Sequence, residues 1–238
     1  MSTLLLRLKG PMQSWGVSSK FDTRTTERAP SKSAIIGMLA CALGRRRNES
    51  IDDLNALRFG VRIDDEGKLI RDFQTAIAYK DTIKNITYDN PTVTHRYYLA
   101  DAAFLVGLEG DDGFIKQIQE ALLHPYFPMF LGRRSCPPEG KVVLGIRNTA
   151  LMDALQNEPW LNEGIKKQHK SSFQYILDAL PNERENTIWR DRPISFNQEK
   201  RQFGFRRVVE ISTKASVTDN PVARTEHDPF AQFEELED

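Results

Sequence analysis

Short stretches in which cations stand beside amides or aromatic rings recur along this chain, and such groups suit phosphates and exposed bases. The earliest stretch, residues 10–16, places Gln13 and Trp15 in a turn that follows an apolar run. Two interpretations of Trp15 stay open. The indole covers an edge of the core, as large aromatic rings often do, or the loop that holds it and Gln13 packs against RNA.

Cations also lead into the start of a predicted helix. Arg24, Arg28 and Lys32 run toward Ser33, where free backbone N–H groups and the helix dipole favour an anion. We therefore expect a phosphate to bind at this helix start. The alternative is a charged loop that is simply solvated.

Residues 131–137 carry two adjacent guanidinium groups between a glycine and a proline, which restrict the backbone locally. Such a loop holds its cations in a narrow range of positions. We expect Arg133, Arg134 and Ser135 to bind phosphate.

Residues 94–98 combine a cation with rings on which bases can stack. The candidate contacts there are His95, Arg96 and Tyr97. Ordinary cross-strand aromatic packing is the alternative, above all for Tyr98.

Two further pairs of arginines have two interpretations each. Arg45 and Arg46 follow the predicted helix, where they bind RNA or only complement the helix dipole. Arg201 and Arg206 lie beside phenylalanines near a late strand, where they contact nucleic acid or protect a sheet edge.

The overall charge balance hides a polarised chain. The 238 residues include 33 Lys/Arg and 33 Asp/Glu. Residues 1–47 carry a net charge of +7 and residues 219–238 one of −6, so the chain without its acidic end has a net charge of +6. Positive charge concentrated near the start indicates a polyanionic partner.

Other kinds of chemistry lack their signatures. The four histidines are scattered, and neither Cys41 nor Cys136 has a neighbour at zinc-ligand spacing. The glycine-rich motifs for nucleotides and the G-x-S-x-G motif of hydrolases are absent. Two cysteines make no disulfide framework, and the chain has neither a signal-peptide start nor an apolar run of about 18 residues. We expect a cytoplasmic protein with no metal or cofactor.

The pattern of elements predicts an α+β fold. Apolar runs and helical spacing predict, in chain order, a strand at 3–8, a helix at about 33–43, strands at 58–64 and 102–108, and a helix at about 114–123. With a last strand near residue 131, the order is the β-α-β-β-α-β of ferredoxin-like and RNA-recognition domains.

We expect three parts in the chain. Residues 1–147 form the RNA-recognition-like domain, and residues 72–99 insert into it as a projecting β-hairpin, or thumb. Residues 148–218 form a smaller β-containing segment packed on that domain. Residues 219–238 form a flexible acidic tail.

Five motifs together closely resemble the CasD family, whose members are subunits of the type I-E CRISPR Cascade complex. They run in the same order as in that family over about residues 1–212. The motifs are G-P-M-Q-S-W-G (10–16), T-R-T-T-E-R-A-P-S-K-S-A-I-I-G-M-L-A-C-A-L-G (23–44), T-H-R-Y-Y-L-A-D (94–101), L-G-R-R-S-C-P (131–137) and R-Q-F (201–203).

This resemblance implies a non-catalytic subunit that caps one end of the surveillance complex and holds the 5′ handle of the crRNA. It implies a modified RNA-recognition domain whose thumb, here residues 72–99, crosses the guide and helps to kink it. The implied partners are the crRNA, the Cascade backbone subunit and the large subunit, with target DNA reached only through the complex. Residues 148–200 match the family poorly, and the acidic end is an extension.

Two other classes of function are weighed against an RNA-binding subunit. The first is a metal-independent endoribonuclease that cuts the repeat RNA, for which His95 with Tyr97 and Lys80 or Lys32 would supply a base and a cation. The second is a protein scaffold without RNA contact, which would leave the +7 start of the chain unexplained. We also consider that the acidic tail docks on a basic neighbour or deters non-specific RNA binding.

Overall fold

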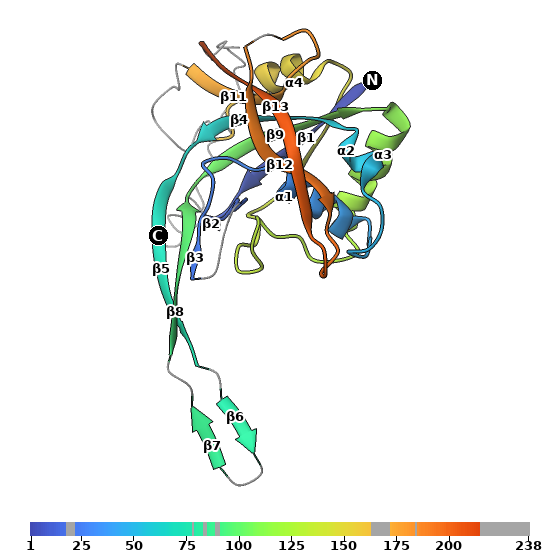
Figure 1. Cartoon of the computed structure of the whole chain (residues 1–238). Helices are drawn as coiled ribbons and strands as arrows, with labels where there is room; N and C mark the ends of the chain where they lie inside the picture. The colour runs from blue at the N-terminus through green and yellow to red at the C-terminus, as the bar shows by residue number, and fades with distance from the viewer. Residues whose placement is uncertain are drawn as a thin grey trace, which may run out of the picture.

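The computed structural model describes residues 1–17, 22–77, 79–82, 85–88, 91–162, 172–183 and 185–214 (Figure 1). The acidic tail predicted at 219–238 lies outside these residues.

One antiparallel sheet of seven strands forms the body, in the order β10-β1-β9-β4-β11-β13-β12. Its strands are β1 (Ser2–Lys9), β4 (Arg58–Asp65), β9 (Ala103–Gly110), β10 (Val143–Arg147), β11 (Ser172–Asp178), β12 (Thr187–Ser195) and β13 (Gln202–Lys214). The β11 strand pairs with β4, so the sheet continues from the first part of the chain into the second.

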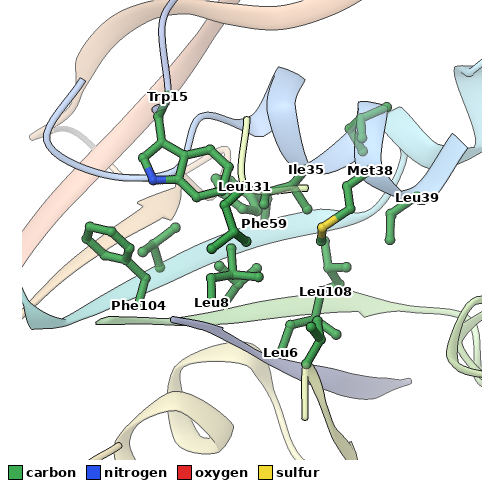
Figure 2. Packing of buried hydrophobic residues seen from close by; sticks show 14 of the residues in the cluster. Leu6, Leu8, Trp15, Ile35, Met38, Leu39, Phe59, Phe104, Leu108 and Leu131 are labelled. Atoms are coloured by element: carbon green, nitrogen blue, oxygen red, sulfur yellow. The ribbon is translucent and has the colours of Figure 1, made fainter. Parts of the chain in front are cut away.

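Helices cover both faces of the sheet. The helices are α1 (Lys32–Ala42), α2 (Asp52–Asn55), α3 (Asp112–Leu123) and α4 (Leu151–Asn157). Helices α1 and α3 pack on the larger core, where Ile35 and Leu39 meet Leu6 and Phe59 (Figure 2). Helix α4 packs on the opposite face, over β1, β4 and β9. The alternation of buried residues along each strand gives each face its own apolar set.

A long hairpin projects from the body (Figure 1). Its arms are β5 (Lys68–Ala76) and β8 (Thr92–Ala100), which pair along their full length. Beyond them β6 (Tyr79–Thr82) pairs with β7 (Asn85–Tyr88). The hairpin therefore begins four residues before the predicted range of 72–99.

Two short strands pair with the base of the hairpin. Strand β2 (Met12–Gln13) pairs antiparallel with the end of β8, and β3 (Thr23–Arg24) pairs parallel with His95 and Arg96 of β8. The loop after β1 and the segment before α1 are thus joined to the hairpin.

The predicted mixed α+β class is confirmed, with two differences in detail. The strand expected near residue 131 is absent, because the Pro/Gly-rich segment 125–140 forms no ladder; the strand after α3 is β10. The sequence also failed to predict β12, in which charged residues and Pro193 hide the strand pattern. Proline is tolerated there because β12 lies at the edge of the sheet.

Candidate nucleic-acid interface

The side chain of Gln13 forms hydrogen bonds within the protein, contrary to the prediction that it contacts RNA. Its side chain is fully buried. Its amide nitrogen donates to the carbonyl oxygens of Leu8 (3.3 Å) and Ala102 (2.7 Å), and its amide oxygen accepts from the indole N–H of Trp15 (3.2 Å). Every polar atom of this amide is used within the protein, so none is left for RNA.

Trp15 belongs to the core, which decides between its two interpretations. The ring is 1% exposed and lies among apolar side chains of the larger core (Figure 2). Its backbone N–H donates to Thr26 Oγ1 at 2.9 Å, and its carbonyl oxygen accepts from Glu27. The prediction that Trp15 packs against RNA is wrong for this fold; the residue instead positions the segment before α1.

Gly132 shows how closely the loop 131–137 is pressed against the same turn. Its φ is +85°, and an added Cβ would lie 1.7 Å from the carbonyl oxygen of Ser14. The backbone N–H of Ser14 in turn donates to the Leu131 carbonyl. Only glycine fits at this contact, which fixes where the following arginines begin.

The start of α1 holds an anion, but the anion is a carboxylate of the protein. Asp191 of β12 accepts from the backbone N–H of Lys32 at 2.8 Å. Ser31 caps the helix by accepting from Ala34, and Ser33 is buried with its hydroxyl 3.2 Å from that of Ser31. The prediction of a phosphate at this helix start is therefore wrong, because Asp191 already meets the helix dipole.

Lys32 and Arg206 are likewise buried in ion pairs rather than free for RNA. Lys32 is 6% exposed and donates to Asp178 (2.7 Å) and to the Leu57 carbonyl. Arg206 is 8% exposed and binds Asp191 through two nitrogens (2.6 and 2.9 Å) and Asp178 through a third (2.8 Å).

Burial alone would lower the pKa of Arg206, but the two carboxylates outweigh it and raise the pKa. We call Lys32, Asp178, Asp191 and Arg206 the ionic cluster.

Three arginines from distant segments meet at the base of the hairpin. Arg24 pairs with Arg96 across β3 and β8, and Arg133 donates to the Arg24 carbonyl oxygen at 2.9 Å. His95 lies beside them, with its backbone N–H bound to Asp22 and its ring 5.8 Å from that of Phe73. We call Arg24, His95, Arg96, Arg133 and the adjoining Arg134 and Ser135 the hairpin-base surface.

Several side chains of the hairpin-base surface lack hydrogen-bond or ion-pair partners among the described residues. His95 Nδ1, Arg96 Nε and Arg133 Nη1 are shielded from solvent, yet they have no hydrogen-bond partner in the described part of the chain. None of the ion pairs among the described residues includes Arg24, Arg96 or Arg133. The unsatisfied N–H donors of Arg96 and Arg133, in guanidinium groups that form no ion pair, favour an anionic ligand.

Aromatic rings support the arginines there. The Arg133 guanidinium lies over the ring of Tyr98, 4.6 Å from its centroid. Tyr98 is buried, whereas Tyr97 is half-buried and its carbonyl accepts from the Ser14 hydroxyl. Cross-strand packing is one of the two interpretations of Tyr98 that the sequence leaves open, and its support of Arg133 is a role that the sequence pattern does not indicate. Arg134 and Ser135 are exposed beside it.

The other predicted contacts lie away from this surface or are partly neutralised. Arg28 is exposed and pairs with Glu210 at 2.6 Å. Arg45 forms a two-pronged pair with Asp53, which raises the pKa of the guanidinium and lowers that of the carboxyl. Arg46 is exposed.

Arg201 forms a smaller cationic site with Arg47. Its guanidinium lies 5.1 Å from the centroid of Phe203 and 5.8 Å from that of Phe196. Burial and then the charge of Arg47 lower the pKa of Arg201. Because Arg47 carries the same charge, it adds to the cationic character of the Arg201 site.

Two kinds of feature are absent from the described residues. Among them, no three His, Cys, Asp or Glu side chains gather to hold a metal ion. No helix in the described part of the chain has the length and apolar character that crossing a bilayer requires.

Known proteins resemble this chain over most of its length. It is 35% identical over 159 residues to the CRISPR system Cascade subunit CasD of Escherichia coli (strain K12), which covers 60% of this chain and 70% of that protein. A chain of a solved CRISPR RNA-guided surveillance complex matches with a TM-score of 0.77 and 32% identity over 91% of this chain and 92% of that one. A crystal structure of a Cas protein matches with a TM-score of 0.70 and 38% identity over 90% and 95%.

The sequence profile of one family matches residues 3–209, which include β1, the hairpin, the hairpin-base surface and nearly all of the seven-stranded sheet. That match spans most of the chain, and the relatives agree with it in sequence and in fold. The chain belongs to the CRISPR-associated protein (Cas_Cas5) family.

Proposed function

We propose that this chain is the CasD-type subunit of a Cascade complex and that it binds the 5′ handle of the crRNA without cutting it. Membership of the Cas_Cas5 family supports this role. So do the likeness to CasD, a Cascade subunit, and to a chain of an RNA-guided surveillance complex. The partners in this proposal are the crRNA, the backbone subunit and the large subunit.

The hairpin-base surface is the proposed RNA site. The observation that carries it is the convergence of Arg24, Arg96 and Arg133, from segments far apart in sequence, without a carboxylate partner among the described residues. Phosphate oxygens accept from guanidinium forks in two-pronged geometry. Exposed Arg134 and half-buried Tyr97 extend the surface with a further cation and a ring.

The fold supports the same role. The strand order β10-β1-β9-β4, with α1 between β1 and β4 and α3 between β9 and β10, is the arrangement that we propose to be ferredoxin-like. In this proposal the hairpin of β5 and β8 acts as the thumb, and RNA lies along its base.

Salt-dependent binding of repeat RNA to the full chain tests the site. We expect Arg133→Gln and Arg134→Gln each to weaken binding and to lower the slope of log K against log [salt] by about one. The matched control is Lys116→Gln on α3, an exposed position that loses the same charge away from the hairpin. If the control lowers the slope as much as the two arginine variants do, net charge and not this surface binds the RNA.

The same RNA, incubated with the chain in EDTA and resolved on a denaturing gel, tests the absence of cleavage. His95 is the histidine at the proposed site, and its side chain has no carboxylate partner among the described residues. An orienting carboxylate is the usual support of a catalytic histidine. We expect intact RNA; cleavage at one position that His95→Ala abolishes would contradict the non-catalytic role.

A further inference from the structure

Strands β12 and β13 carry a surface, at the edge of the seven-stranded sheet, that no other helix or strand of the described residues covers. Along β12 the buried Asp191 and Pro193 alternate with exposed residues, because successive side chains point to opposite faces. The exposed set combines large apolar and basic side chains. It comprises Ile188, Arg190, Arg192 and Ile194 of β12 with Phe205 and Arg207 of β13, which we call the outer face.

The apolar members of the outer face are unusually open to solvent. Ile188, Ile194 and Phe205 are 70%, 54% and 64% exposed. Helix α1 packs on the other side of β12, and α4 packs on β1, β4 and β9 instead. Helix α2 touches β12 near Pro193, at one end of this surface. In Figure 1, β12 and β13 lie at the front of the molecule, ahead of α1. Apolar side chains gathered with cations in this way are typical of an interaction surface.

Shallow hollows lie at both ends of this surface. One of about 670 Å³ is lined by Pro181, Asn186, Ile188 and Arg207, among others. The other, of about 290 Å³, is lined by residues that include Arg192, Ile194 and Phe205. Each hollow holds an arginine and an exposed apolar side chain, together with one carboxylate of the chain, Glu183 in the first and Asp52 in the second. The three arginines of the outer face outnumber these two carboxylates, so the surface suits a ligand with an apolar group next to an acid.

The chain itself contains a segment of that chemistry. Residues 219–238 hold seven acidic residues and one arginine, for a net charge of −6. Phe230, Phe233 and Leu236 recur among those acids at every third position. The sequence thus repeats the combination of apolar group and acid that the two hollows suit.

The acidic segment also begins close enough to the outer face to reach it. It follows β13, the strand that supplies Phe205 and Arg207. Seven residues separate Lys214 from Arg207, about 23 Å along a strand. The twelve residues from 215 to 226 span up to about 40 Å when extended, so the acidic segment can lie along the whole outer face.

We propose that the acidic segment 226–238 docks on the outer face of β12 and β13, its phenylalanines on Ile188, Ile194 and Phe205 and its carboxylates on the arginines. This contact is separate from the proposed RNA site, since it uses neither the hairpin nor residues 131–137. It covers an apolar surface that the rest of the described chain leaves open.

Paramagnetic broadening in NMR spectra of the full chain, without RNA, tests the docking. A nitroxide is attached through Ala231→Cys in a Cys41→Ser background, because Cys41 is partly exposed and Cys136 is buried. We expect the amide signals of β12 and of residues 202–208 to broaden. The broadening should weaken in about 1 M NaCl, where the Debye length is only about 3 Å.

A matched pair of charge reversals makes the result specific. Arg192→Glu with Arg207→Glu should abolish the broadening of β12, whereas Lys68→Glu with Arg71→Glu, exposed on the hairpin strand β5, should preserve it. Broadening centred on Arg24 and Arg133 would overturn the proposal, because the tail would then cover the hairpin-base surface. Absence of broadening throughout the described chain would overturn it as well. Both results leave the RNA-binding proposal standing, because RNA affinity is measured separately.

Discussion

The ionic cluster and the hairpin-base surface are both built from arginines and lysines of the same basic part of the sequence and from later segments, yet they differ in what neutralises them. In the ionic cluster, Asp178 and Asp191 reach Lys32 and Arg206 from β11 and β12. At the hairpin-base surface, Arg24, Arg96 and Arg133 lie beside other cations and carbonyl oxygens and form no ion pair among the described residues, although Asp72 is the cross-strand neighbour of Arg96.

The difference separates structural from ligand-binding cations. A buried charge without a partner costs several kcal/mol, so the two carboxylates are a condition for burying Arg206. Arginines that the fold brings together without such carboxylates depend on solvent or on an external anion. Substitutions that remove one side chain at a time from each region test this contrast.

The largest effect is expected from Asp191→Ala. The variant loses both contacts to Arg206 and the carboxylate at the start of α1, which leaves a buried guanidinium with Asp178 alone. Breaking a buried pair in this way costs about 3–5 kcal/mol of unfolding free energy, measured by urea denaturation. Asp53→Ala is the control: its exposed pair with Arg45 should contribute about 1 kcal/mol or less. Equal losses in the two variants would remove the distinction between buried and surface pairs.

A smaller loss is expected from Gln13→Met. The variant leaves the carbonyls of Leu8 and Ala102 and the indole N–H of Trp15 without their partner. Unsatisfied buried groups cost about 1–3 kcal/mol, so urea denaturation should show a lower midpoint. RNA affinity should fall with it, because the turn fastens the segments that carry Arg24 and Arg133. Exposed Gln117→Met on α3 should change neither; a stable Gln13→Met variant would refute the fastening role.

Arg133→Gln should cost little stability, in contrast to the ionic cluster. Its guanidinium stacks on Tyr98 and donates to backbone carbonyls, but Nη1 has no partner in the described chain. The expected loss is about 1 kcal/mol, while RNA binding weakens as described above. A drop in the urea midpoint as large as that of Asp191→Ala would mean that Arg133 is structural.

The smallest effect is expected from Glu27→Gln. Burial, and then the nearby charge of Asp191, raise the pKa of Glu27 above its ordinary value of 4.5. A carboxyl whose pKa is higher in the folded state binds its proton more tightly there, so its contribution to stability falls as pH rises through that raised pKa. The glutamine variant should be slightly more stable than the wild type at pH 7 and lose this advantage near pH 4. Thermal unfolding at both pH values measures this; a variant less stable at pH 7 would contradict the assignment.

The sequence by itself determined the class of fold and the family. Apolar periodicity in residues 3–8, 33–43, 102–108 and 114–123 follows from local geometry, and β1, α1, β9 and α3 lie there. The motifs of the hairpin and of residues 131–137 pointed to the family that the profile match shows. Local pattern carries such information because each element must present its own apolar side.

Only the tertiary structure decided which polar residues are available for a ligand. Nothing near Lys32 in sequence indicates that Asp191, 159 residues later, occupies the helix start. Likewise the burial of Gln13 and Trp15 depends on contacts with Ala102, Thr26 and residue 132. The sequence shows which side chains are charged or aromatic. Whether such a side chain is neutralised or buried depends on residues that only folding brings close to it.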